Sequence, residues 1–334
     1  MNALDAAITR ARGLSTHLLS GPDCEELRAA PDLGALAERL RSAPDPIVLP
    51  VPGLPGPDAL EAAIRRRAGT RLAGLARWCA EAPDVVTVLF GEEDRRNLRL
   101  LLHGVVESAL PADRLRGTIP TPSLPAGALN TLAAQTTIAA MAALLSAWRH
   151  HDAAALGLSR APGPPDLIAL DAALTRCWAA RATAAAARVD DELRRYVAAS
   201  IDLENAITAV MLARSGAEQT ELEAVPGGMR FPPARWKVVS AAGSVAAAAA
   251  LAREAFTGTP FEHAFSGTGG VGLVRTRAWT SALRIARVRA RSAPLSSAPL
   301  IAYVLAVRDE VQKLQRLVYA LALGAPASAR RGEQ

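Results

Sequence analysis

The glycines of Gly267–Gly272 have the GxGxxG spacing that can hold the pyrophosphate of a dinucleotide. That chemistry requires a strand before the glycines, a helix after them and an acidic residue about 20 residues further on. Here the preceding segment FEHAFS is too short and too polar for a buried strand, and no acid follows before Asp309. The chain also contains no P-loop motif. The pattern therefore favours a flexible glycine loop over a nucleotide-binding site.

Two further groups have residue types that bind metal ions. The carboxylates of Asp190–Glu192 could hold Mg²⁺, but Arg194 and Arg195 follow at the spacing of ion pairs on a helix. His150 and His151 are adjacent, so on a helix they point about 100° apart rather than to one ion. We expect a solvated, salt-bridged face at the first group and a surface helix end at the second. No hydrolase signature occurs, so the sequence predicts no catalytic residue, metal or cofactor.

Residues 275–291 form the strongest basic stretch of the chain, with six arginines and no acidic residue. The arginines are Arg275, Arg277, Arg284, Arg287, Arg289 and Arg291. On a helix, such a stretch is either an exposed, solvated face or a contact surface for an acidic protein or for lipid headgroups. Nucleic acid is the weakest alternative, because no recognised nucleic-acid-binding motif accompanies the arginines. The net charge of +6 is mild for 334 residues and does not demand an acidic partner.

Three segments repeat an acidic residue followed, one helical turn later, by a polar or basic residue. The pairs are Asp94 with Asn97, Asp202 with Asn205, and Glu310 with Lys313. Both intervals are 108 residues, and in that register an apolar i, i+3, i+4, i+7 face occurs three times, beginning at Leu98, Ala206 and Leu314. We expect the acids to lie at or near helix starts, where a carboxylate caps free N–H groups. In the second segment, Asn205 should be hydrogen-bonded.

The elements that carry these residues are predicted to be helices. Half of the chain is hydrophobic but only 4% is aromatic, and the apolar residues are mostly Ala, Leu and Val. Ala and Leu favour helices, and the scarcity of strand-forming residues argues against all-β and doubly wound α/β folds. Helices are expected at 62–79, 170–188 and 276–291 before the three repeats, and at 129–148 and 236–253 after the first two. The sequence predicts an all-α body of three pseudo-threefold-related modules, at 1–125, 126–233 and 234–334.

The cellular location is predicted from one long uncharged segment, the cysteines and the N-terminal residues. The uncharged segment Leu129–Trp148 is rich in Ala and polar residues, which favours a helix buried in protein over a membrane span. Three widely spaced cysteines and a first segment without an apolar signal region indicate a reducing cytoplasm and buried thiols.

The repeats resemble a family of central-stalk proteins from V/A-type ATPases, the C-type subunits, whose eukaryotic members are the d-type subunits. Asp202, Asn205 and Arg214 hold the positions of the family's D-x-x-N-x-x-x-x-x-x-R helix, and Asp94 and Asn97 form its first-module version. The C-terminal signature of the family is matched at Pro299, Tyr303, Glu310, Val311 and Leu314. Lys313 and Gln315 depart from it, because the family has Asn and Arg there.

This resemblance implies a funnel-shaped, all-helical subunit that catalyses nothing itself. Such a subunit lies on the cytoplasmic end of the membrane rotor ring, receives the foot of the central shaft in its cavity, and transmits torque between ATP chemistry and ion movement. The implied partners are the shaft subunits and the ring, with no nucleic acid and no small-molecule substrate. Two other interpretations remain open: a helical scaffold or basic nucleic-acid-binding protein, and a helical isoprenoid-type enzyme built on Asp190 and Asp191 with Glu92–Asp94 opposite.

Overall fold

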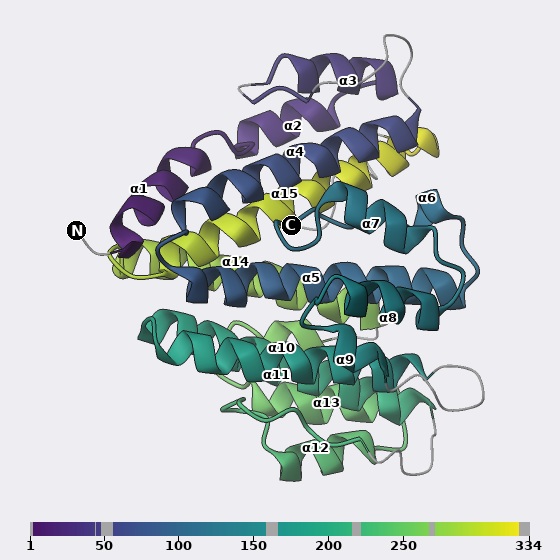
Figure 1. Cartoon of the computed structure of the whole chain (residues 1–334), viewed down its shortest axis with the longest axis vertical. Coiled ribbons are helices and arrows are strands. Elements are labelled where there is room, and N and C mark those ends of the chain that lie inside the picture. The colour runs from purple at the N-terminus through teal and green to yellow at the C-terminus, as the bar shows by residue number, and fades with distance from the viewer. Residues whose placement is uncertain are drawn as a thin grey trace.

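The computed structural model describes residues 3–43, 45–47, 56–157, 166–215, 222–266 and 271–326. Throughout these ranges the regular elements are helices, and none of the described residues lies in a strand (Figure 1). The predicted all-α fold is therefore confirmed. The three cysteines are free, with Cys79 buried and Cys24 and Cys177 only half-buried, so the expectation of buried thiols holds for one of them.

Three pairs of consecutive long helices, each joined by a short turn, form the body. They are α4 with α5 (Pro57–Trp78 and Pro83–Val106), α10 with α11 (Leu167–Ala187 and Asp191–Ser215), and α14 with α15 (Val271–Ser292 and Ala298–Ala322). The last two pairs pack along each other, whereas α4 packs mainly on α15 and α5 on α10. The turns within the pairs lie at the same end of the molecule, on the left in Figure 1, and we call this the turn end. Side chains connect these turns: Arg188 pairs with Asp84, and Asp190 accepts from the Ser297 N–H at 2.6 Å and its hydroxyl at 2.7 Å.

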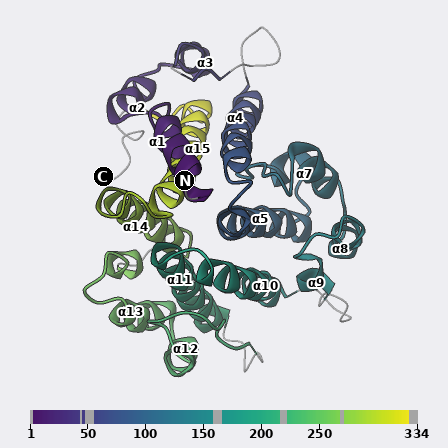
Figure 2. The same cartoon turned by 60° about the vertical axis from the view of Figure 1, so that its left-hand side comes forward.

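Three hairpins of short helices lie outside the long pairs, in different directions (Figure 2). They are α2 with α3 (Gly21–Arg28 and Leu33–Arg41), α7 with α8 (Ala126–Ala133 and Ile138–Ala147), and α12 with α13 (Pro233–Ser240 and Val245–Ala255). Short segments complete the set: α1 (Ala3–Ser15), α6 (Pro111–Arg114), α9 (Ala153–Leu156) and the 3₁₀ helix η2 (Glu262–Phe265).

The continuous helices expected at 129–148 and 236–253 are wrong, because each is broken into one of these hairpins. The second helix of each hairpin starts at an extended N-cap residue whose side chain accepts a backbone N–H. Thr137 accepts from Ala140 at 3.2 Å, and Ser244 accepts from Ala247 at 3.2 Å. A capped helix start recovers a hydrogen bond that would otherwise be lost, which fixes the break. In the N-terminal hairpin, Asp32 caps α3 in the same way.

The apolar core follows these pairs and hairpins. The largest buried cluster joins the N-terminal helices to α4, α10, α11 and α15, while α7–α8 cover α5 and α10, and α12–α13 cover α11 and α14. Within the described residues, one helix is long and apolar enough to cross a membrane, Asp191–Ala213, and 72% of its apolar window is buried inside the protein. The uncharged segment chosen from the sequence, Leu129–Trp148, is not one continuous helix.

Candidate functional site

The repeated asparagines anchor a loop that returns to the middle of their own helix. The Asn97 side chain donates to the Ile119 carbonyl at 2.7 Å and accepts from the Ile119 N–H at 2.9 Å. Asn205 makes the same two bonds with Val225, at 2.9 and 2.8 Å. Both amides are buried, and each satisfies both polar groups of one loop residue, as a neighbouring strand would. The pair of contacts therefore recurs in two parts of the chain.

The repeated aspartates bind the same loops a few residues later. Asp94 accepts from the hydroxyls of Thr121 and Ser123. Asp202 accepts from three consecutive backbone N–H groups, those of Met229 at 3.0 Å, Arg230 at 2.9 Å and Phe231 at 2.9 Å. A buried carboxylate is costly unless it is hydrogen-bonded, and both are.

The expectation that these acids lie at helix starts is wrong. Asp94 and Asp202 lie in the middle of α5 and α11, and they cap the loops that lead into α7 and α12 rather than their own helices. In the second loop the backbone at Gly228 passes very close to the Asp202 carboxylate, because a Cβ added to Gly228 would lie 2.1 Å from Asp202 Oδ1. The loop can pass over the carboxylate only with glycine at this position.

The third pair binds a different segment. Glu310 accepts from the Leu19 N–H at 2.7 Å and from Arg71 Nη1 at 2.6 Å, and it also pairs with Arg67. Its partners thus come from the N-terminal segment and α4, not from a loop that follows α15. Lys313 does not replace the asparagine, because its side chain is 44% exposed and pairs with Asp309 at 2.7 Å. The other departing residue, Gln315, donates to Glu61 at 2.9 Å.

A buried network of charges joins four helices at the centre, and sequence reasoning missed it. The Arg95 side chain is fully buried, 3.1 Å from Thr175 Oγ1 and 3.3 Å from Glu204, with its guanidinium 5.1 Å from the centre of the Trp178 ring. Arg99 lies 3.2 Å from both Asp171 and Glu204. Burial would raise the pKa of Glu204, but the charges of Arg99, Arg275 and Arg95 outweigh it and hold this pKa well below its ordinary value.

A second cluster adjoins this network around Trp279. Two guanidinium groups lie over the Trp279 ring, that of Arg96 at 4.4 Å and that of Arg308 at 4.8 Å from its centre. Arg308 pairs with Glu93, while burial lowers the pKa of Arg308 to about 9. These contacts bring α5, α14 and α15 together. In the sequence, the charged run from Glu92 to Arg96 is the one local feature that points to these contacts. It is not recognisable as buried, because such runs usually mark a solvated helix face.

The basic stretch divides into two parts on α14. Arg275 lies 3.4 Å from Glu204 and Arg277 donates to the Ser266 carbonyl, so both are held inside the chain. The remaining four arginines are exposed, and of these Arg289 lies 3.7 Å from Glu192. Among the described residues no ion pair involves the other three, Arg284, Arg287 and Arg291. The free basic surface is therefore smaller than the sequence suggests and lies toward the turn end.

The other candidates from the sequence serve structural roles where they are described. Gly267–Gly270 lie outside the described residues, as does the Arg214 side chain, and Gly272 belongs to α14. Asp190 caps α11 by accepting from the Leu193 N–H at 2.9 Å. The expected solvated, salt-bridged face is only partly correct: Asp191 pairs with the exposed Arg194 and Glu192 with the exposed Arg195, but Asp190 is half-buried and bonds Ser297, and the Glu192 side chain is only 11% exposed. No group of three metal-binding side chains occurs in the described ranges.

His150 is not part of a surface helix end, which corrects that expectation. Its side chain is buried, 3.8 Å from both Asp94 and Asp152, whereas His151 is exposed. The reason is the left-handed conformation of Arg149, with φ of 55°, which ends α8 and turns the chain inward.

These contacts define a protein whose described residues form helices, with the long helices held to one another by buried charges. The chain belongs to the ATP synthase (C/AC39) subunit family, because the sequence model of that family matches residues 7–331, nearly the whole chain. The resemblance to the C-type subunits of V/A-type ATPases is thereby confirmed. No curated protein matches the chain in a direct sequence comparison.

Proposed function

We propose that this protein is a non-catalytic central-stalk subunit of a V/A-type rotary ATPase or ATP synthase. It links the central shaft to the membrane rotor ring and transmits torque for proton or sodium transport coupled to ATP synthesis or hydrolysis. The observation that carries the proposal is the family match over residues 7–331. Membership in this family makes the chain a subunit of an ATP synthase complex, and its partners are other subunits of that complex.

The buried charges support a mechanical role. A subunit that carries torque must resist sliding of one helix along another. Helices packed only through small apolar side chains slide more easily than helices joined by directional hydrogen bonds and ion pairs. Arg95, Arg99 and Glu204 join α5, α10 and α11 through bonds that cannot be re-formed after a shift of one helical turn. Breaking such a buried pair costs about 3–5 kcal/mol, far more than an exposed one.

We further propose that the body is a funnel of three related modules, at 1–125, 126–233 and 234–334, with a pseudo-threefold arrangement. Within these bounds each module would contain one hairpin and one long-helix pair: α2–α3 in the first, α7–α8 in the second and α12–α13 in the third. An acid of another module's long helix would anchor the segment that leads into each hairpin, and Glu310 does so for the first by binding Leu19 just before α2. The repeated anchors at Asp94 and Asp202 support this equivalence.

The turn end is the side that we assign to the membrane ring, on the cytoplasmic face of the cell membrane. Arg287 and Arg291 are exposed near it, and two large apolar side chains are exposed there, Trp78 by 49% and Leu295 by 80%. Exposed apolar residues beside basic ones suit a partner with acidic loops.

Assembly with the membrane sector tests this assignment. Charge reversal of Arg284, Arg287 and Arg291 to Glu should weaken binding to membranes that carry the rotor ring, and more strongly at low salt, because exposed charges are screened. The matched control is Arg66→Glu, Arg176→Glu and Arg253→Glu, which makes the same change in charge at exposed positions of other helices, away from the turn end. Wild-type affinity of the first variant at low ionic strength would show that this face is merely solvated.

The proposed role itself is tested by reconstitution. An ATPase assembled without this subunit should hydrolyse ATP while ion pumping is lost, and adding the subunit should restore pumping. The isolated chain should bind neither ATP nor NAD in calorimetry. A micromolar dissociation constant for either nucleotide, or full coupling without the subunit, would refute the proposal.

A further inference from the structure

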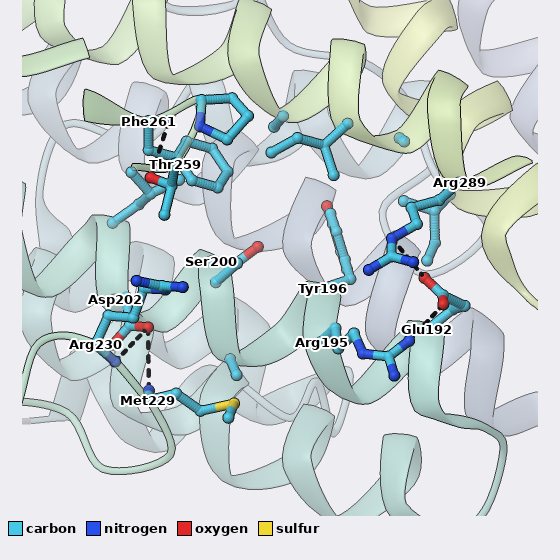
Figure 3. A pocket seen from close by; sticks show the side chains of 18 of the residues that line it. Glu192, Arg195, Tyr196, Ser200, Asp202, Met229, Arg230, Thr259, Phe261 and Arg289 are labelled. Atoms are coloured by element: carbon cyan, nitrogen blue, oxygen red, sulfur yellow. Dashed lines mark hydrogen bonds and ion pairs between the residues drawn. The ribbon is translucent and has the colours of Figure 1, made fainter. Parts of the chain in front are cut away.

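A pocket of about 770 Å³ lies between α11 and α14, apart from the charge networks described above (Figure 3). Its volume is within the range of about 300–1,000 Å³ that is typical of small-molecule sites. Small and branched side chains form its walls: Ala199 and Leu203 from α11, Ala282 and Ile285 from α14, and Ile301 from α15. Ser200 and Tyr196 also lie between the ends (Figure 3), and the Tyr196 hydroxyl donates to Glu92, so the middle of the pocket is mainly apolar.

Charged side chains mark the two ends of the pocket. At one end, Arg195 and Arg289 share a single carboxylate, Glu192, at 2.5 and 3.7 Å. The Arg195 and Arg289 side chains are 54% and 47% exposed, so donors remain free and one positive charge is left over. Arg230 lies at the opposite end (Figure 3), where Asp202 is already occupied by three backbone N–H groups.

We propose that this pocket binds one acyl chain of an anionic amphiphile, whose phosphate or carboxylate headgroup lies against Arg195 and Arg289. An apolar middle with a net positive end matches an apolar chain with an anionic head, and a guanidinium group recognises either anion through paired donors. The Arg195 end is favoured over the Arg230 end because the exposed Arg291 follows on α14 and extends the basic surface.

A protein segment fits this space less well than an acyl chain does. An α-helix with side chains is about 10 Å wide, so the pocket would hold only about two turns of one. At Ala199, Ala282 and Ala286 the walls carry only methyl groups, which form low ridges for a partner helix to interlock with. A helix in this pocket would bury too little apolar surface for stable docking.

Binding is tested on the full-length chain with cis-parinaric acid, a fatty acid that fluoresces in apolar sites, and with dodecyl phosphate as competitor. We expect one site per chain, displacement by dodecyl phosphate, and binding about tenfold weaker for dodecanol, which lacks the charge. Vesicles of phosphatidylglycerol, compared with phosphatidylcholine, then show whether the chain also captures a membrane lipid. Absence of a saturable site, or equal competition by dodecanol, would overturn the proposal.

Variants separate the two parts of the site. Ala282→Phe fills the apolar middle and should abolish probe binding, while Ala290→Phe, on the same helix but outside the pocket, should not. The double variant Arg195→Gln with Arg289→Gln should weaken binding of the anion about tenfold, and Arg230→Gln should leave it within about twofold. If Ala282→Phe fails to fold by circular dichroism, Ala199→Phe fills the same space from the opposite wall. Unchanged binding in a folded filling variant would overturn the assignment, as would a larger effect at Arg230.

Discussion

The anchor at Asp202 allows the sharpest test of the fold, through removal of its carboxylate. Asp202→Ala leaves three backbone N–H groups without their acceptor. Water can reach Met229 and Arg230, which are exposed, but Phe231 is buried. Charge-assisted bonds contribute more than neutral ones and a buried donor left unpaired costs about 1–3 kcal/mol, so we expect a loss of about 3–5 kcal/mol in the free energy of unfolding.

Urea unfolding followed by circular dichroism measures this loss, and Asp191→Ala is the matched control. Asp191 lies on the same helix, but its side chain is 66% exposed and pairs only along the helix surface with Arg194. The control should therefore change stability by less than about 0.5 kcal/mol. In thermal unfolding the corresponding shifts are roughly 5–10 °C for Asp202→Ala and less than about 2 °C for Asp191→Ala.

A double-mutant cycle with Gly228 tests whether the loop really lies on the carboxylate. Gly228→Ala alone should cost at least about 2 kcal/mol, because the new Cβ would meet Asp202 Oδ1 at 2.1 Å. In the Asp202→Ala background that collision is gone. Gly228→Ala should therefore lower the free energy of unfolding by less there, with a coupling energy of about 1–3 kcal/mol. Strict additivity of the two changes would refute the described contact, and an unchanged Asp202→Ala stability with lost assembly would make the pair an interface element.

Other buried groups give three more expected outcomes. Asn97→Ala and Asn205→Ala should each lower the free energy of unfolding by about 1–3 kcal/mol in urea titrations, because each leaves both polar groups of a loop residue unpaired. Glu310→Gln should cost about 3–5 kcal/mol because Arg67 and Arg71 lose their shared buried carboxylate, whereas the exposed Lys313→Ala should cost less than about 0.5 kcal/mol; equal effects would contradict the assignment. Burial raises the pKa of Tyr303 from its ordinary 10 to about 12. The contribution of the neutral phenol to the free energy of unfolding is therefore complete below pH 10 and is lost as pH rises to 12. Tyr303→Phe should flatten the fall of stability with pH in this range, and an unaltered curve would exclude this cause.

The sequence predicts the long helices well and the contacts between them poorly. Helix content and the buried faces follow from Ala, Leu and their spacing, which are local properties. The hairpin breaks at Thr137 and Ser244 escape prediction because a single N-cap side chain competes with uninterrupted helix-favouring runs on both sides.

The central charges escape prediction for another reason. Arg95 and Glu204 are 109 residues apart, and nothing near either residue indicates that both are buried. Charged residues are mostly exposed, so a run such as Glu92–Arg96 is interpreted as surface until its distant partners are known. The repeat of Asp94 and Asn97 at Asp202 and Asn205 is visible in the sequence, but what the side chains bind is not, because hydrogen bonds to backbone loops leave no trace in residue type.

The contact between Leu19 and Glu310 also has a consequence for how the protein is made. The two residues are 291 positions apart, so the N-terminal hairpin leaves the ribosome long before the helix that it packs on. At about 5–20 residues per second, that interval is roughly 15–60 seconds. During it, the apolar faces at Leu36 and Leu40 and the cations of Arg67 and Arg71 have no α15 to cover them. The first part of the chain to be synthesised is thus among the last to reach its final packing, and a chain truncated before Glu310 would expose these faces to chaperones and proteases.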